Sequence, residues 1–253
     1  MSADPAVPHQ LAASGYKDRL KHMAHSVLDP VVAALARLGL QPDHVTVAGL
    51  VLSVVAGFAF FDGQNRVAAL VLSLAGVCDI LDGQLARRAG RVSNYGAFLD
   101  STLDRLAEAA VLVGIAGYYA SNLLGLQAKS QAMLEQVVLG EIEGPIALLV
   151  AQNQAVEPVT WLVLTITAML ALVGSFMVSY TRARAEGLGL ECKVGWFERP
   201  ERIVLLIVAG LIQVFWAMSV ALLLLAILSF TTAAQRVMHV HRITRASGAD
   251  ERA

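Results

Sequence analysis

Long stretches without charged side chains dominate the chain from residue 45 onward. They are Val45–Phe61, Val67–Cys78, Ala109–Gln127, Pro158–Thr181 and Ile203–Gln235. A helix needs about 20 mostly apolar residues to cross the roughly 30 Å hydrocarbon core of a bilayer. The second stretch reaches this length when it is extended to Ala86, and the third reaches it when it begins near Tyr95. The last stretch is long enough for two helices, with a break between Gln213 and Ala217. The pattern predicts an all-α integral membrane protein with six transmembrane helices.

A different pattern precedes the first stretch. Tyr16–Leu38 carries apolar residues at helical spacing, and its basic residues gather near its start, as in a helix that lies in the membrane interface. We therefore expect an amphipathic interfacial helix within an N-terminal segment of residues 1–41, then a six-helix domain at 42–240 and a tail at 241–253. The first forty residues contain no unbroken apolar core of a secretory signal, so we expect no cleaved leader.

The composition supports this class. Hydrophobic residues make up 57% of the chain, charged residues only 15%, and the mean hydropathy is +0.62, which argues against a soluble globular, disordered or disulfide-scaffold protein. The net charge is −1 and the basic residues form no tail, so nucleic acid is not an expected partner. Cys78 and Cys192 show no metal-ligand spacing and no expected bridge.

The positions of the basic residues predict the orientation. Six spans with both termini in the cytoplasm place all but three of the 19 basic residues on the cytoplasmic side, as the positive-inside rule requires. Five spans would leave the basic C-terminal residues on the other side. Residues 127–157, which include Glu135, Glu141 and Glu143, are then an extracytoplasmic insertion, which we expect to be a loop with a short helix.

Four carboxylates lie within or at the edge of the second and third spans: Asp79, Asp82, Asp100 and Asp104. An aspartate near the centre of a membrane helix costs about 2.5 to 3.5 kcal/mol, so these acids need compensation. Spacings of three and four residues put each pair on one helix face, and two antiparallel helices then bring all four together. Structural ion pairs with arginine are one explanation, but only Arg105 lies at a similar depth. A pair of divalent cations that clamps a phosphoryl group is the favoured one.

These acids belong to a longer string, Asp79-x2-Asp82-Gly83-x2-Ala86-Arg87-x8-Gly96-x3-Asp100-x3-Asp104. At all eight fixed positions it resembles the signature of the CDP-alcohol phosphotransferases, integral membrane enzymes that make phospholipids from a CDP-linked donor. Chance agreement is expected on the order of once in a billion starts or less, at residue frequencies of roughly 5 to 10%.

The resemblance implies roles for these residues. The four aspartates would surround two Mg²⁺ ions, with Mn²⁺ as an alternative, and Asp104 would also be the catalytic base. The implied CDP-binding residues are Thr46, Asp79, Asp82, Gly83, Ala86, Arg87 and Gly96. Thr46 enters because Pro42–Thr46 resembles a Pro-Asn/Asp-x-x-Thr element of the family, although a threonine there also suits a helix cap. The two glycines leave space for a ligand or, alternatively, for a neighbouring helix.

Arginines gather at the cytoplasmic ends of the fourth and fifth spans, in Ser179–Gly187 and Gly195–Arg202. One explanation is that they only set the orientation of the spans. The other is a phosphate pocket, since arginine forks bind phosphate bidentately. Both strings resemble the branch of the family that uses inositol phosphate, the bacterial phosphatidylinositol-phosphate synthases and their archaeal relatives. That resemblance implies Arg182, Arg184, Arg199 and Arg202 as ligands of the acceptor phosphate.

The resulting hypothesis is a membrane transferase. It moves a phosphatidyl group from CDP-diacylglycerol or CDP-archaeol to inositol phosphate, releases CMP, and works at the cytoplasmic side of the cell membrane among membrane lipids. The resemblance also implies a homodimer. Three alternatives stay open at this point: glycerol phosphate as the acceptor, CDP-inositol as a donor that yields an inositol phosphodiester, and a cation transporter that uses the acids for ion passage.

Overall fold

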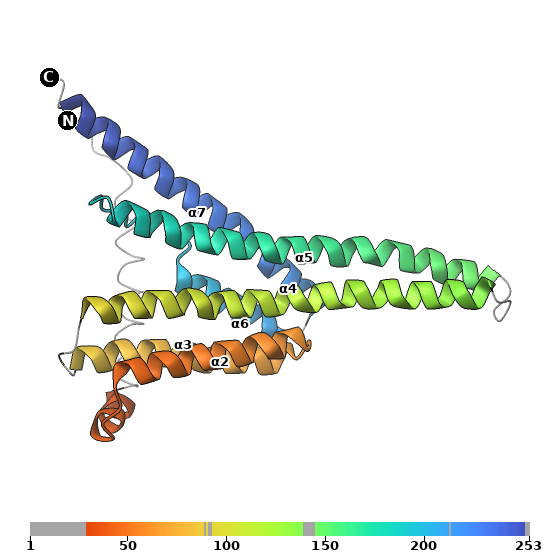
Figure 1. Cartoon of the computed structure of the whole chain (residues 1–253), viewed down its shortest axis with the longest axis horizontal. Helices are drawn as coiled ribbons and strands as arrows, with labels where there is room; N and C mark the ends of the chain where they lie inside the picture. Colours follow the sequence, from red (N-terminus) through yellow and green to blue (C-terminus); the bar gives the residue numbers. More distant parts are fainter. Residues whose placement is uncertain (1–28, 89, 91–92, 139–144, 213, 251–253) are drawn as a thin grey trace. The chain divides into compact units, whose positions relative to one another are not determined.

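The computed structural model describes residues 29–88, 90, 93–138, 145–212 and 214–250. Its helices in chain order are α2 (Pro42–Phe61), α3 (Asn65–Arg88), α4 (Asn94–Val138), α5 (Pro145–Glu186), α6 (Arg199–Ile212) and α7 (Phe215–Asp250) (Figure 1). Residues 29–37 are helical as well, and the described residues contain no strand. The predicted all-α class is therefore confirmed.

Local signals explain several helix ends. Pro42 opens α2, where its fixed φ suits the first helical position and its missing N–H costs nothing. Gly63, two residues after the end of that helix, has a φ of 74°, which a glycine adopts without the strain of a side chain. Ser93 caps α4, because its Oγ accepts a hydrogen bond from the Gly96 N–H at 3.0 Å.

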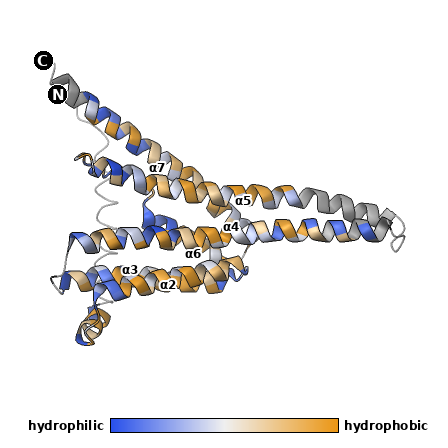
Figure 2. Ribbon diagram, in the orientation of Figure 1, coloured by the Kyte–Doolittle hydropathy of each residue, from blue (hydrophilic) through white to orange (hydrophobic). Residues whose placement is uncertain are grey.

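Five helical segments are long and apolar enough to cross a membrane: Pro42–Phe61, Asn65–Arg88, Asn94–Ala128, Pro158–Glu186 and Trp216–Arg245. Figure 2 shows hydrophobic residues along them. The chain therefore has the helices of a multi-pass membrane protein. The predicted break in the last apolar stretch is confirmed, since α6 ends at Ile212 and α7 begins at Phe215.

The sixth span and the interfacial helix stay predictions. Helix α6 has 14 residues, which corresponds to about 21 Å and is less than the membrane core. Residues 16–28, most of the expected interfacial helix, lie outside the described residues, as do residues 251–253 of the expected tail.

The prediction that residues 127–157 form a loop with a short helix is wrong. Helix α4 continues to Val138 and α5 starts at Pro145, so the described part of this segment is helical, and residues 139–144 lie outside the description. The physical reason is composition. The segment is polar, but its alanine, leucine, glutamine and glutamate residues are strong helix formers, and polarity alone does not end a helix. Its extracytoplasmic location stays a prediction.

The chain forms two compact units, the first made of residues up to 49 and 76–103, the second of residues 50–75 and 104–253. The first has a small core of Val32, Val45, Leu81 and Leu85. The second has a larger one, in which Phe60, Leu112 and Leu222 are almost completely buried. Within the second unit α5 runs alongside α7 (Figure 1).

Close helix contact in the second unit depends on glycine. A Cβ on Gly57 would lie 2.5 Å from the Ala110 carbonyl oxygen, and a Cβ on Gly114 would overlap the Gly57 carbonyl group. Helices α2 and α4 therefore touch backbone to backbone, a packing that small residues permit in membrane proteins.

Candidate active site

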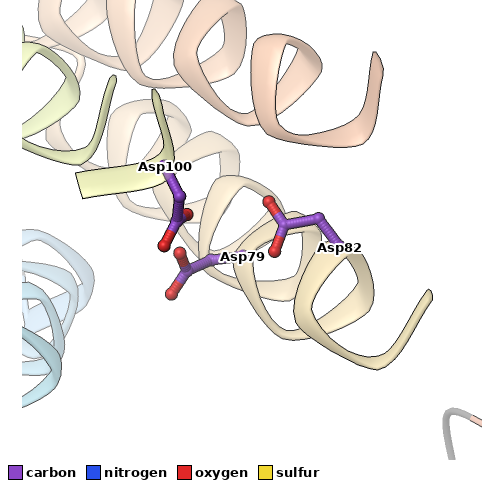
Figure 3. A group of neighbouring side chains, drawn as sticks. All are labelled: Asp79, Asp82 and Asp100. Atoms are coloured by element: carbon purple, nitrogen blue, oxygen red, sulfur yellow. The ribbon is translucent and has the colours of Figure 1, made fainter. Parts of the chain in front are cut away.

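Three of the four predicted acids converge in the first unit. Asp79 and Asp82 on α3 and Asp100 on α4 each offer a carboxylate oxygen, and these three oxygens lie within 4.8 Å of one another (Figure 3). Asp82 is 6% exposed, and its buried Oδ2 has no hydrogen-bond partner among the described residues. A buried carboxylate oxygen without a partner is costly unless a cation satisfies it. The donor set, all oxygen and all acidic, fits a hard divalent cation.

A cavity of about 580 Å³ adjoins this cluster in the same unit. Its lining combines the start of α2, the end of α3 and the start of α4, with Gln41, Pro42, Asp43, Thr46, Asp82, Gly83, Ala86, Arg87, Ser93, Gly96, Ala97 and Asp100. All the residues predicted to bind CDP line it except Asp79, which belongs to the acid cluster. The structure therefore brings together residues that lie up to fifty positions apart in the sequence.

The small residues of the cavity leave it open. Among the described residues of the first unit, a Cβ on Gly83 would meet only Arg87 Nη2 within 4 Å, at 3.7 Å, so no other helix of this unit packs on the glycine. Of the two explanations for Gly83, space for a ligand fits this geometry better than helix packing. The Arg87 Nε–H donates to the Gly83 carbonyl at 3.1 Å, which holds the guanidinium beside the cavity.

Thr46 does not cap its helix. Its hydroxyl donates to the Pro42 carbonyl, one turn earlier, at 3.2 Å, whereas a cap would accept from a free backbone N–H. Thr46 instead lines the cavity, together with Asp82.

The fourth acid, Asp104, lies in the second unit. Its Oδ2 forms an ion pair with Arg199 Nη1 at 2.7 Å, and the two side chains are 20% and 26% exposed. The predicted base therefore contacts a predicted phosphate ligand, a pairing that sequence spacing did not indicate.

Arg202 differs from expectation. It is 1% exposed, and its Nε and Nη2 donate to the two carboxylate oxygens of Glu108 at 2.6 and 2.9 Å. Ser175 donates to the same carboxylate at 2.8 Å. The fork of Arg202 is thus occupied by a protein carboxylate, and Arg202 anchors α6 in the second unit. All four arginines stay proposed ligands of the acceptor phosphate, and for Arg202 the Nη1 atom, which has no hydrogen-bond partner among the described residues, is the group that could take this role.

Comparison with known proteins identifies the family of this chain. Residues 40–233 match the family model described as CDP-alcohol phosphatidyltransferase. The chain belongs to this family. The matched range includes residues 79–104, which carry the aspartate signature.

Named relatives of this phosphatidyltransferase come from archaea and bacteria. The archaetidylinositol phosphate synthase of Methanothermobacter thermautotrophicus is 33% identical over 84% of this chain and 88% of its own length. The phosphatidylinositol phosphate synthase of Mycolicibacterium smegmatis is 34% identical over 88% and 86%.

Solved structures agree with these relatives. The phosphatidylinositol phosphate synthase of Mycobacterium tuberculosis with CDP-DAG bound has a TM-score of 0.63 and 30% identity, over 83% of this chain and 92% of that one. A second structure of that enzyme, in complex with manganese and citrate, also has a TM-score of 0.63 and 30% identity, over 83% and 87%.

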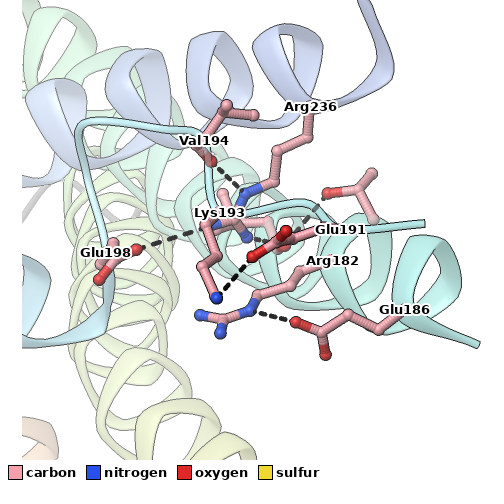
Figure 4. A network of polar contacts seen from close by, with 9 residues as sticks. Arg182, Glu186, Glu191, Lys193, Val194, Glu198 and Arg236 are labelled. Atoms are coloured by element: carbon pink, nitrogen blue, oxygen red, sulfur yellow. Dashed lines mark hydrogen bonds and ion pairs between the residues drawn. The ribbon is translucent and has the colours of Figure 1, made fainter. Parts of the chain in front are cut away.

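The remaining predicted arginines of the phosphatidyltransferase lie near the end of α5. The Arg182 Nε–H donates to Glu186 at 2.9 Å in an exposed pair (Figure 4). Arg184 is exposed as well. In the connection that follows, Lys193 donates to Glu191 at 2.6 Å. This hydrogen bond lowers the pKa of the Glu191 carboxyl group and raises the pKa of Lys193.

Sequence reasoning missed Glu108. A signal was present, because Glu108 is a further acid in a membrane span, four residues after Asp104 and so on the same helix face. It also missed Arg236, which had been counted only among the residues that set orientation but whose Nε–H donates to the Val194 carbonyl at 2.8 Å (Figure 4). No periodicity or motif marks that arginine, and it lies outside the family match.

Proposed function

We propose that this chain transfers a phosphatidyl or archaetidyl group from a CDP-linked lipid to a hydroxyl group of inositol phosphate and releases CMP. The observation that carries the proposal is the convergence of Asp79, Asp82 and Asp100 within 4.8 Å, beside a cavity that also holds Arg87. Membership of the family supports the reaction class, and the names of the relatives support inositol phosphate as the acceptor.

The cavity suits the nucleotide end of the donor. Its volume of about 580 Å³ falls in the range of roughly 300 to 1,000 Å³ that is usual for small-molecule sites. Arg87 offers a cationic fork to the pyrophosphate, and Gly83 and Ala86 keep the wall free of large side chains. The mycobacterial relative has been solved with CDP-DAG bound, which supports this class of donor.

The acids suit divalent cations. We propose that Asp104, one helical turn after Asp100 in the sequence, completes the set and that the chain holds two Mg²⁺ ions, with Mn²⁺ as a substitute. Such ions, when bound, stabilise negative charge on phosphoryl oxygens. The manganese complex of the relative supports a divalent metal in this family.

Asp104 is the proposed base. Its carboxylate takes the proton of the acceptor hydroxyl, the hydroxyl oxygen forms a bond to the lipid-side phosphorus, and the bond from that phosphorus to the bridging oxygen of CMP breaks. The ion pair with Arg199 supports this role, because it holds the guanidinium that we propose as a ligand of the acceptor phosphate next to Asp104. A phosphate held by Arg199 would therefore orient the attacking hydroxyl, and we propose Arg182, Arg184 and Arg202 as its further ligands.

The membrane arrangement belongs to the same proposal. Six spans, both termini in the cytoplasm and an active site on the cytoplasmic side account for the basic connections of the chain. In this arrangement the polar substrates meet at the cytoplasmic interface while the lipid tails stay in the bilayer. A homodimer is proposed by analogy with the family.

The test is release of CMP by the purified protein in lipid. CDP-diacylglycerol and CDP-archaeol are each offered with inositol phosphate, glycerol phosphate, free inositol or no acceptor, with and without a chelator. We expect metal-dependent release that is fastest with inositol phosphate. Asp82→Asn is the inactive control, and Glu135→Gln on the exposed part of α4 is the matched neutral one. Equal rates with glycerol phosphate would refute the acceptor, and full activity in chelator would refute the reaction.

A further inference from the structure

A second cavity lies in the first unit, between the short helix at residues 29–37 and the end of α3. Its volume is about 520 Å³, and its lining residues are Asp29, Val32, Gln84, Arg87 and Arg88. Of these five, only Arg87 also lines the cavity proposed for the nucleotide. Val32 is 1% exposed and belongs to the small core that the short helix shares with α3, so the two helices are packed together at this place.

Gln84 provides a buried donor in this cavity. Its side chain is 7% exposed, and its Nε2 has no hydrogen-bond partner among the described residues. A buried amide nitrogen without an acceptor costs free energy, so it requires an acceptor that the described residues do not supply. The guanidinium groups of Arg87 and Arg88 line the same cavity. An amide and two guanidinium groups together form a donor set that suits phosphate oxygens.

Asp29 adds a carboxylate to the lining. A carboxylate repels a simple anion, but it accepts a hydrogen bond from an ammonium or hydroxyl group. The cavity therefore offers donors for a phosphate and an acceptor for a second group of the same ligand. Phospholipid headgroups that carry an ammonium or a hydroxyl group combine these two features, whereas inorganic phosphate lacks the second group.

The part of α3 that precedes the cavity favours a lipid over a soluble phosphate. Residues three or four positions apart share one face of a helix, and on α3 this spacing joins Val77, Ile80, Gln84 and Arg88. Val77 and Ile80 are 37% and 39% exposed, on a helix that is long and apolar enough to cross a membrane. A hydrocarbon chain that lies along Val77 and Ile80 would therefore bring its headgroup to Gln84 and Arg88.

We propose that this cavity is a second phospholipid site, separate from the donor site. Its occupant is a membrane phospholipid whose headgroup carries a phosphate together with an ammonium or hydroxyl group. The phosphate binds Gln84 Nε2 and Arg88, and the ammonium or hydroxyl group binds Asp29. Arg87 is the wall that the two cavities share. Binding of this lipid needs neither metal, CDP-lipid nor acceptor, so the site goes beyond the proposed transfer reaction.

The experiment measures lipid binding to the full chain in detergent by native mass spectrometry. The chain is titrated with phosphatidylethanolamine, phosphatidylglycerol or phosphatidylcholine. Wild type should bind one molecule of either of the first two at least about fivefold more tightly than phosphatidylcholine, whose headgroup has no N–H or O–H donor. Asp29→Ala should lower the affinity for phosphatidylethanolamine to that for phosphatidylcholine.

The variants that test the phosphate contacts are Gln84→Leu and Arg88→Gln. Each should weaken the tight binding at least about tenfold, because a hydrogen bond to a charged group is lost. Arg37→Gln is the matched control, since Arg37 is an exposed arginine of the short helix that does not line the cavity, and its affinity should stay within about twofold of wild type. Arg88 is exposed, so Arg88→Gln decides the question if Gln84→Leu does not fold.

Four results would overturn the proposal. The first is equal affinity of wild type for phosphatidylcholine, and the second is an affinity of either folded variant equal to that of Arg37→Gln. The third is displacement of the lipid by millimolar inorganic phosphate, which would make the cavity a site for a free anion. The fourth is loss of the lipid in Gly83→Leu, which obstructs the nucleotide cavity and should otherwise leave lipid binding unchanged. Release of CMP is not measured here, so failure of the proposed function would leave this test intact.

Discussion

The ion pair between Glu108 and Arg202 gives the sharpest prediction for stability. The two side chains are 5% and 2% exposed, and they share two hydrogen bonds of 2.6 and 2.9 Å. Ser175 adds a third bond to Glu108. The substitution Glu108→Ala leaves the Arg202 guanidinium buried without its carboxylate and removes a buried ion pair between α6 and α4.

The expected size of the effect follows from this geometry. Removal of one partner of a buried ion pair costs about 3 to 5 kcal/mol, because the remaining charge is uncompensated. Ser175→Ala removes only one hydrogen bond to a charged group, worth about 1.5 to 3 kcal/mol. The double variant Glu108→Leu with Arg202→Met removes both charges together, so we expect it to be more stable than Glu108→Ala by at least about 2 kcal/mol.

The assay is reversible unfolding of wild type and variants in mixed micelles, with SDS as the denaturant. Glu135→Ala is the matched control, since it removes an exposed glutamate from the same helix and should change the free energy of unfolding by less than about 0.5 kcal/mol. If Glu108→Ala costs no more than this control, or if the double variant is as unstable as the single one, the assignment of Arg202 as an anchor is wrong.

Further predictions concern the cavity, the metal and the helix contact. Asp82→Asn should lower the affinity for Mn²⁺, measured by electron paramagnetic resonance, by more than about tenfold, because loss of a residue that only supports a ligand already costs about that much. Unchanged affinity would exclude Asp82 as a ligand. Gly83→Leu should fill the cavity and raise the KM for CDP-lipid while the KM for the acceptor stays constant. Gly114→Ala overlaps the Gly57 backbone and should cost at least about 1 to 3 kcal/mol in SDS unfolding. A Cβ on Gly125 would meet nothing within 4 Å in the described part of the chain, so Gly125→Ala should cost nothing; equal losses in the two variants would contradict the close contact at Gly114.

Local physics made much of the fold and site predictable. The lengths of the apolar stretches predict helices, and the first stretch, Val45–Phe61, lies inside α2. The interruption after residue 212 falls at the start of the predicted interval. Because side chains three or four positions apart share a helix face, the spacing of Asp79 and Asp82 already put them together, and Asp100 joins them as predicted.

What only the tertiary structure decided is the partner of each charged group. An arginine near a span end has the same local pattern whether it sets orientation, binds phosphate or anchors a helix. Arg202 is an anchor because packing of the second unit brings Glu108 to it, ninety-four positions away in the sequence. Arg236 on α7 donates to the Val178 carbonyl of α5 because α7 runs beside α5. Such contacts depend on which helices are neighbours, and the spacing of residues along a single helix shows only which side chains share a face of that helix.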